Sequence, residues 1–113
     1  MALPQGIVVE IDGPNGDSVH VRVRGELDMS AAPELGEVLS GLSPDVLNVT
    51  LDLAGVTFLD SSAIRTLVSA GLERQEAGGT LRLGPCSDAV MRVLEITGLA
   101  ASSDAFTVLP GGS

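Results

Sequence analysis

The strongest constraint on the fold is a change of apolar period in the middle of the chain. Apolar and polar residues alternate over positions 46–53, and alternation with a period of two is typical of a strand. Beyond Ser61 the apolar residues recur at the spacing of an amphipathic helix: Ile64, Leu67, Val68 and Leu72. A short β-rich run at 80–83 follows. Strand, helix and strand in this order predict parallel pairing through a right-handed crossover.

The segments before this unit predict a hairpin and a helix. A β-rich run at 7–11 leads into turn formers at 12–17, and a second strand then alternates up to Gly25, with Val19, Val21 and Val23 on its buried face. The next apolar stripe has helical spacing, with Pro33 and Glu34 suited to the first turn: Leu35, Val38, Leu39 and Leu42. We expect this helix to end in a turn at 42–45.

The segments after position 76 predict one more helix and one more strand. The Ala-Gly-Gly sequence at 77–79 is suited to end the preceding helix, and the break at 84–86 ends the strand at 80–83. Ser87 can cap a third helix that ends at Gly98, with an apolar stripe of Val90, Val93, Leu94 and Thr97. An extended piece at 105–109 then precedes a tail at 110–113 that we expect to be frayed.

Together these elements predict an α/β fold. We expect a mixed sheet of four to five strands, with an N-terminal hairpin and three or so helices packed on it. At 113 residues the chain has the size of one domain, with a core over about 7–108.

Composition narrows the classes of partner. Six Lys plus Arg against fifteen Asp plus Glu give a net charge of −9, which disfavours nucleic acid and anionic membranes and favours a protein with a basic contact surface. Residues 1–6 lack a basic start and a long apolar run, so we expect a cytoplasmic protein. Cys86 has no second cysteine, and His20 in an alternating strand is expected on the sheet surface rather than as a general base.

The candidate site lies at the start of the second helix. Ser61 is expected to project its hydroxyl into solvent beside unpaired backbone N–H groups, a suitable place for a phosphate. Alternatively, Asp60 and Ser61 are only helix-capping residues. Asp28 either caps the first helix or holds the loop after Gly25. A hydrolase is disfavoured because no Gly-x-Ser-x-Gly turn or nearby base accompanies Ser61, and a phosphocarrier is disfavoured because phosphoserine is a stable ester.

Four short motifs add a resemblance to a known family. They are Gly-Glu-Leu-Asp at 25–28, Leu-Asp-Leu at 51–53, Phe-Leu-Asp-Ser-Ser at 58–62 and Ala-Gly-Gly-Thr-Leu at 77–81. In order and spacing they resemble the STAS domain of bacterial anti-sigma factor antagonists, over about 7–106. The individual motifs are weak, and their combination carries the resemblance.

The resemblance implies partner switching. In that family the unphosphorylated antagonist binds an anti-sigma factor that is also a GHKL-type serine kinase, and this frees a sigma factor. The kinase phosphorylates the serine after the aspartate, here Ser61, and a PP2C-type phosphatase reverses the reaction. Asp60 and Asp28 match positions near the kinase contact, and Ser62 is a minor alternative acceptor. The antagonist itself is no enzyme and needs no cofactor, because magnesium and ATP belong to the kinase.

Two residues depart from the family pattern. Many members have Gly where this chain has Ala63, and often Gly where it has Arg65. We expect the Ala63 methyl group to weaken or redirect the kinase contact, and Arg65 to pair with a phosphate or with a nearby acid. Both departures keep an alternative open, a STAS scaffold or small-ligand sensor that is never phosphorylated.

Overall fold

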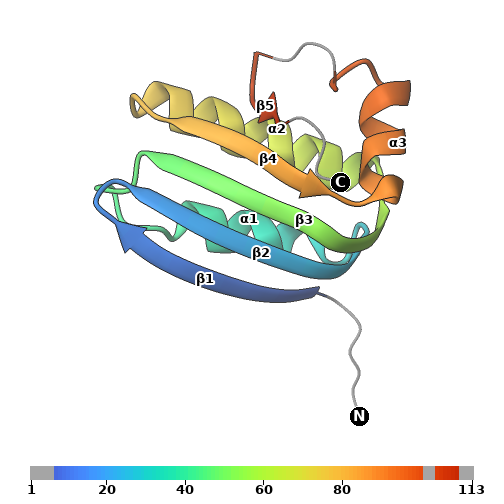
Figure 1. Cartoon of the computed structure of the whole chain (residues 1–113), viewed down its shortest axis with the longest axis horizontal. Coiled ribbons are helices and arrows are strands. Elements are labelled where there is room, and N and C mark those ends of the chain that lie inside the picture. The colour runs from blue at the N-terminus through green and yellow to red at the C-terminus, as the bar shows by residue number, and fades with distance from the viewer. Residues whose placement is uncertain (1–6, 101–103, 110–113) are drawn as a thin grey trace.

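Five strands form one mixed sheet, and two of the three helices lie behind it in the view of Figure 1. The computed structural model describes residues 7–100 and 104–109. The elements are β1 (Ile7–Asn15), β2 (Ser18–Leu27), α1 (Ala32–Ser40), β3 (Asn48–Leu59), α2 (Ser61–Glu76), β4 (Thr80–Cys86), α3 (Asp88–Ile96) and β5 (Thr107–Val108). The strand order is β1-β2-β3-β4-β5; β1 is antiparallel to β2, and the other pairs are parallel. The predicted α/β class, hairpin and mixed sheet are confirmed.

The core lies between the sheet and the helices behind it in Figure 1. Val19, Val21 and Val23 of β2 are at most 2% exposed, while His20, Arg22 and Arg24 between them are exposed on the opposite face. The alternation that predicted this strand therefore reports a real difference between its two faces. The core is aliphatic, because its buried members are Val, Leu and Ala with one Phe.

Both central strands extend past their predicted ends. β2 continues through Gly25 to Leu27, and β3 runs to Leu59 rather than ending at position 53. Register shifts interrupt the β2–β3 pairing between Arg22 and Arg24 and again after Gly25. Such irregularities break the period of two while the backbone stays extended, so the pattern in the sequence stops before the strands do.

The other strands also differ from their predicted limits. β1 extends to Asn15 through a register shift, so only residues 16–17 remain as the turn. β4 extends through the expected break to Cys86, and β5 is shorter than the expected 105–109. The expected frayed tail at 110–113 and the N-terminal residues 1–6 lie outside the described residues.

The helices confirm most of the apolar stripes and correct two positions. Leu35 and Leu39 of α1 are buried, and Leu42, in the expected turn after that helix, is half-buried and packs against the core. Leu72 of α2 is 45% exposed, because Ala70 and Gly71 occupy the buried face at that turn. In α3 the predicted cap is confirmed by the Val90 N–H, which donates to the Ser87 hydroxyl, whereas Thr97 is an exposed C-cap residue.

Candidate functional site

Strand register brings the two candidate aspartates together. Leu27 at the end of β2 pairs with Leu59 at the end of β3, and each is followed directly by an aspartate, Asp28 and Asp60. The Asp60 N–H donates to the Leu27 carbonyl at 3.2 Å, which ties the two chain segments together. The carboxyl ends of parallel strands thus form one edge of the sheet from which both loops leave.

Asp60 caps α2 and leaves Ser61 as its first helical residue. The Ala63 N–H donates to Asp60 Oδ1 at 3.1 Å, and Asp60 itself has an extended backbone. Ser61 is exposed, and its hydroxyl makes no hydrogen bond within residues 7–100 and 104–109. The capping alternative therefore applies to Asp60, whereas the Ser61 side chain has no capping role among the described residues.

Asp28 holds the loop between β2 and α1. One carboxylate oxygen, Oδ1, accepts from the Ser30 N–H, the Ser30 hydroxyl and the Ala31 N–H, each at 3.0 Å. These bonds, first of all that from the Ala31 N–H, lower the pKa of Asp28 from its ordinary value. The N-cap of α1 is Ala31, which has no capping side chain, and the bonds to Asp28 lie in the turn before that helix, so they favour the loop-holding interpretation.

Ala63 and Arg65 point in different directions from α2. Ala63 is 0% exposed, so its methyl group packs in the core and does not reach the surface. This placement removes the physical basis for the expected effect of Ala63 on a docking partner. Arg65 is exposed and makes no ion pair or hydrogen bond within the part of the chain that the structure describes.

Two adjoining hollows form a groove between α1 and α2 that begins at Ser62. The smaller hollow, about 270 Å³, is lined by Met29, Ala32, Pro33, Ser62, Arg65 and Thr66. A larger hollow of about 420 Å³ continues along the same two helices and shares Pro33, Arg65 and Thr66. Met29, 72% exposed, is a residue that the sequence analysis missed, although an apolar residue directly after Asp28 in a predicted loop was an available signal.

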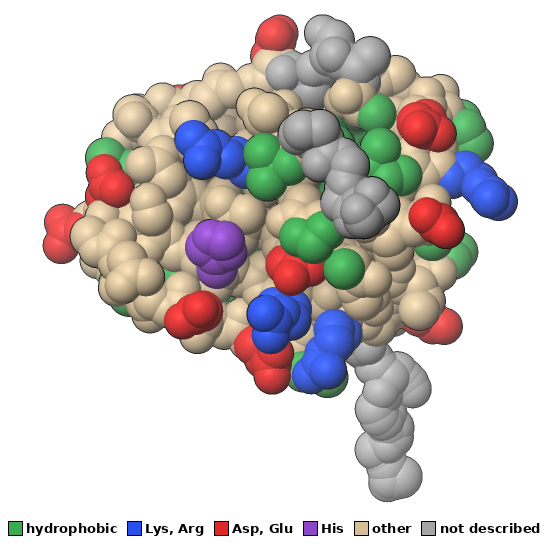
Figure 2. Space-filling view, viewed as in Figure 1, with side chains coloured by type: hydrophobic (Ala, Val, Ile, Leu, Met, Phe, Trp, Pro, Cys, Tyr) green, Lys and Arg blue, Asp and Glu red, His purple; other side chains and the backbone are tan. Residues whose placement is uncertain are grey.

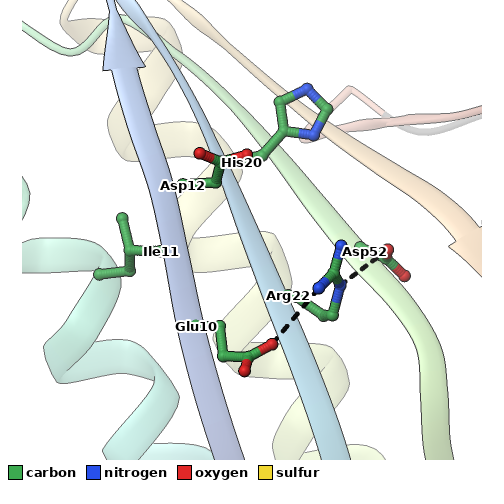
Figure 3. A pocket seen from close by; sticks show the side chains of 6 residues that line it. All are labelled: Glu10, Ile11, Asp12, His20, Arg22 and Asp52. Atoms are coloured by element: carbon green, nitrogen blue, oxygen red, sulfur yellow. Dashed lines mark hydrogen bonds and ion pairs between the residues drawn. The ribbon is translucent and has the colours of Figure 1, made fainter.

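A separate hollow of about 340 Å³ lies on the sheet face opposite α1 and α2. Charged side chains of both signs gather on this face (Figure 2). Arg22 lies between Glu10 and Asp52, at 3.4 and 3.5 Å (Figure 3). His20 is exposed here, opposite Asp12, which confirms its predicted place on the sheet surface. These ion pairs keep the face polar, and because they are exposed they contribute little to the free energy of unfolding.

Other kinds of site find little support in residues 7–100 and 104–109. No group of three or more His, Cys, Asp or Glu side chains in these residues could hold a metal ion. Cys86 is half-buried. Its burial, and to a smaller extent the negative charge of the nearby Asp52, raises the pKa of its thiol to about 11. A thiol with so high a pKa is a poor nucleophile at neutral pH. No helix within the same ranges is long and apolar enough to span a bilayer.

Comparison with known proteins agrees with this arrangement. The family model described as "Mlab, STAS domain" matches residues 12–110. The chain belongs to the STAS domain family. It is similar to the anti-sigma-B factor antagonist of Bacillus subtilis, with 30% identity over 98 residues that cover 87% of this chain and 90% of the relative. The resemblance found in the sequence motifs is therefore confirmed.

Solved structures extend the likeness to the whole STAS fold. The crystal structure of an anti-sigma factor antagonist from Mycobacterium paratuberculosis superposes with a TM-score of 0.79 at 25% identity, covering 99% of this chain and 92% of the other. The Bacillus cell fate determinant SpoIIAA, solved in its phosphorylated form, has a TM-score of 0.68 at 19% identity, covering 90% and 91%. The second of these supports the fold alone.

Proposed function

We propose that this STAS protein is an anti-sigma factor antagonist regulated by phosphorylation of Ser61. In the unphosphorylated state it binds an anti-sigma factor that is also a GHKL-type serine kinase, and this binding frees a sigma factor. Phosphate on Ser61 ends the interaction, and a PP2C-type phosphatase restores it. We further propose that the protein acts in the cytoplasm and catalyses no reaction itself.

The observation that carries this proposal is an exposed, unbonded serine hydroxyl at the strand ends where two hydrogen-bonded aspartates lie. Asp60 caps the helix and Asp28 holds the adjoining loop through hydrogen bonds to backbone N–H groups. The names of the relatives point to the same biological role. Ser62 is half-buried, which favours Ser61 as acceptor.

The group transfer needs no catalytic residue from this chain. The kinase transfers the γ-phosphoryl group of ATP to the Ser61 Oγ, the hydroxyl proton is lost, and ADP leaves. The phosphatase uses water to break the same phosphorus–oxygen bond, which restores the hydroxyl and releases inorganic phosphate. This chain contributes the acceptor and the surface that the partner recognises.

Phosphorylation acts at the contact surface in this proposal. A phosphate adds about −1.5 to −2 charges at neutral pH, next to Asp60 on a chain whose net charge is already −9. At the first position of α2 the unpaired backbone N–H groups and the helix dipole favour an anion, so the helix stays folded. We therefore expect amide chemical shifts to change near Ser61 and to stay closely similar across the sheet.

The test is phosphopeptide mapping of the protein purified from its native cells, in growth and under stress. Trypsin leaves Ser61 in a long peptide from Gly25 to Arg65, so a protease that cuts after Leu59 and Leu67 is added. Phosphate on Ser61 that varies with condition supports the switch. If the peptide is well detected but never phosphorylated, the scaffold or ligand-sensor alternative replaces it.

Binding variants test the role of the same residue. Each variant carries an affinity tag and is used to capture its partner. The Ser61→Ala variant should bind the kinase and keep it bound when ATP is present, while Ser61→Asp should bind the kinase poorly. Ser62→Ala is the matched control and should be switched normally. Equal binding by Ser61→Ala and Ser61→Asp would contradict the proposal.

A further inference from the structure

Arg65 lies on the same face of α2 as Ser61, where its positive charge can interact with a group on the Ser61 side chain. The two residues are four apart in α2, and residues at that spacing lie one above the other on the same helix face. Both are exposed. Arg65 also lines the small hollow with Ser62, so its side chain lies on the groove side of the acceptor.

Arg65 is available for such a contact. Among the described residues, Arg22 and Arg24 form ion pairs on the open sheet face, and Arg74 donates to the carbonyl groups of Val46 and Leu39. Arg65 makes no such contact there. Glu37 and Glu73 line the larger hollow with it, yet neither forms an ion pair with it.

The other charges near Ser61 are negative. Asp60 precedes the serine directly, and Asp28 lies at the same sheet edge. Both carboxylates repel a phosphate on Ser61, while a guanidinium fork can donate two hydrogen bonds to phosphate oxygens. Arg65 is thus the nearest arginine in the helix that can offset part of this repulsion.

We propose that Arg65 pairs with the phosphate of phosphorylated Ser61 within the same chain, and that this pairing lengthens the life of the phosphorylated state. The inference rests on the proposed function, since it needs a phosphate on Ser61. The pair draws the phosphate toward the groove between α1 and α2 and shields it from the phosphatase. Arg65 is a positioning residue, because it neither accepts nor transfers the phosphoryl group.

The experiment installs phosphoserine at position 61 of the full chain by genetic-code expansion, so that no kinase is needed. The phosphorylated wild type is compared with Arg65→Gln and Arg65→Lys. The matched control is Arg92→Gln, which changes an exposed arginine of α3 that has no ion pair within the described residues. Thermal melts of the unphosphorylated forms check that each variant folds.

Two readouts follow the installed phosphate. Phosphorus NMR across a pH series gives its second pKa, which should be higher in Arg65→Gln than in the wild type, because the cation favours the dianion; Arg65→Lys should fall between them. A fixed amount of lambda phosphatase should release phosphate about 1.4- to 2.3-fold faster from Arg65→Gln, because a helix pair of this spacing contributes about 0.2 to 0.5 kcal/mol. Arg92→Gln should match the wild type in both.

An unchanged phosphate pKa in Arg65→Gln would overturn the pairing, and an unchanged rate of release would overturn its effect on lifetime. An equal change in Arg92→Gln would mean that general charge is responsible, which also overturns the proposal. Failure of the proposed function is seen separately, as absence of phosphate on Ser61 in native cells.

Discussion

The substitution Ala63→Gly tests whether this residue acts through the core or through the partner surface. Ala63 is 0% exposed in the first turn of α2. Glycine costs about 1 kcal/mol relative to alanine in a helix interior, and less in a first turn, so we take roughly half of that. Removal of one buried methyl group costs about 0.8 kcal/mol more. We expect the free energy of unfolding to fall by roughly 1 to 1.5 kcal/mol.

Urea denaturation followed by far-UV circular dichroism measures this loss, and a scan should show Tm lower by about 4 to 6 °C. Ser69→Gly is the control at an exposed position of the same helix, and it should lose only about 0.5 kcal/mol because little packing is removed. Affinity for the captured anti-sigma factor should be unchanged once the folded fraction is taken into account. Full stability together with several-fold tighter binding would refute the placement of the methyl group in the core.

Three further predictions concern packing, acid stability and the open sheet face. Gly71→Ala should lower the free energy of unfolding by about 2 kcal/mol or more, because the added Cβ would overlap the backbone carbonyl of Ala105; urea denaturation measures the loss, and a neutral effect would contradict the close approach. Asp28 has a lowered pKa, so its contribution is present above its ordinary carboxyl pKa and is lost as pH falls through the lowered value. Asp28→Asn should therefore flatten the acid limb of a stability-versus-pH curve, and an unchanged limb would count against the loop bonds. Arg22→Ala should lower the free energy of unfolding by less than about 1 kcal/mol, because the ion pairs of Arg22 are exposed. This difference, measured by urea denaturation, should not change with added salt above physiological ionic strength. A larger loss would show that the ion pairs are structural.

Much of the fold could be predicted because the apolar periods are clear where one face meets the core. Val19, Val21 and Val23 identified their strand, and Leu35 and Leu39 identified their helix. The strand ends were missed because irregular pairing beyond position 53 removes the alternation but not the extended backbone. Leu72 was misplaced because small residues, Ala70 and Gly71, occupy the buried face where chain segments come close.

The candidate site was predicted in part, for a different reason. The position of Ser61 follows from a local signal, the change from strand to capped helix. The proximity of Asp28 and Asp60 depends on the pairing of Leu27 with Leu59, which no local pattern encodes. The burial of Ala63 was missed because the residue was interpreted by comparison with the family motif, although its spacing of four residues from Leu67 places it on the buried helix face.

The union of two distant chain segments at the Leu27–Leu59 pair also bears on when the protein becomes competent during synthesis. The two aspartates of the candidate site follow strand ends that lie 32 positions apart in the chain, separated by α1 and most of β3. Pairing of this kind forms only after the whole intervening crossover has left the ribosome, because a nonlocal contact needs both of its strands. An incomplete chain that stops before β3 has neither half of the site in its final geometry. Translation must therefore pass the end of β3 before a new molecule can compete for a partner.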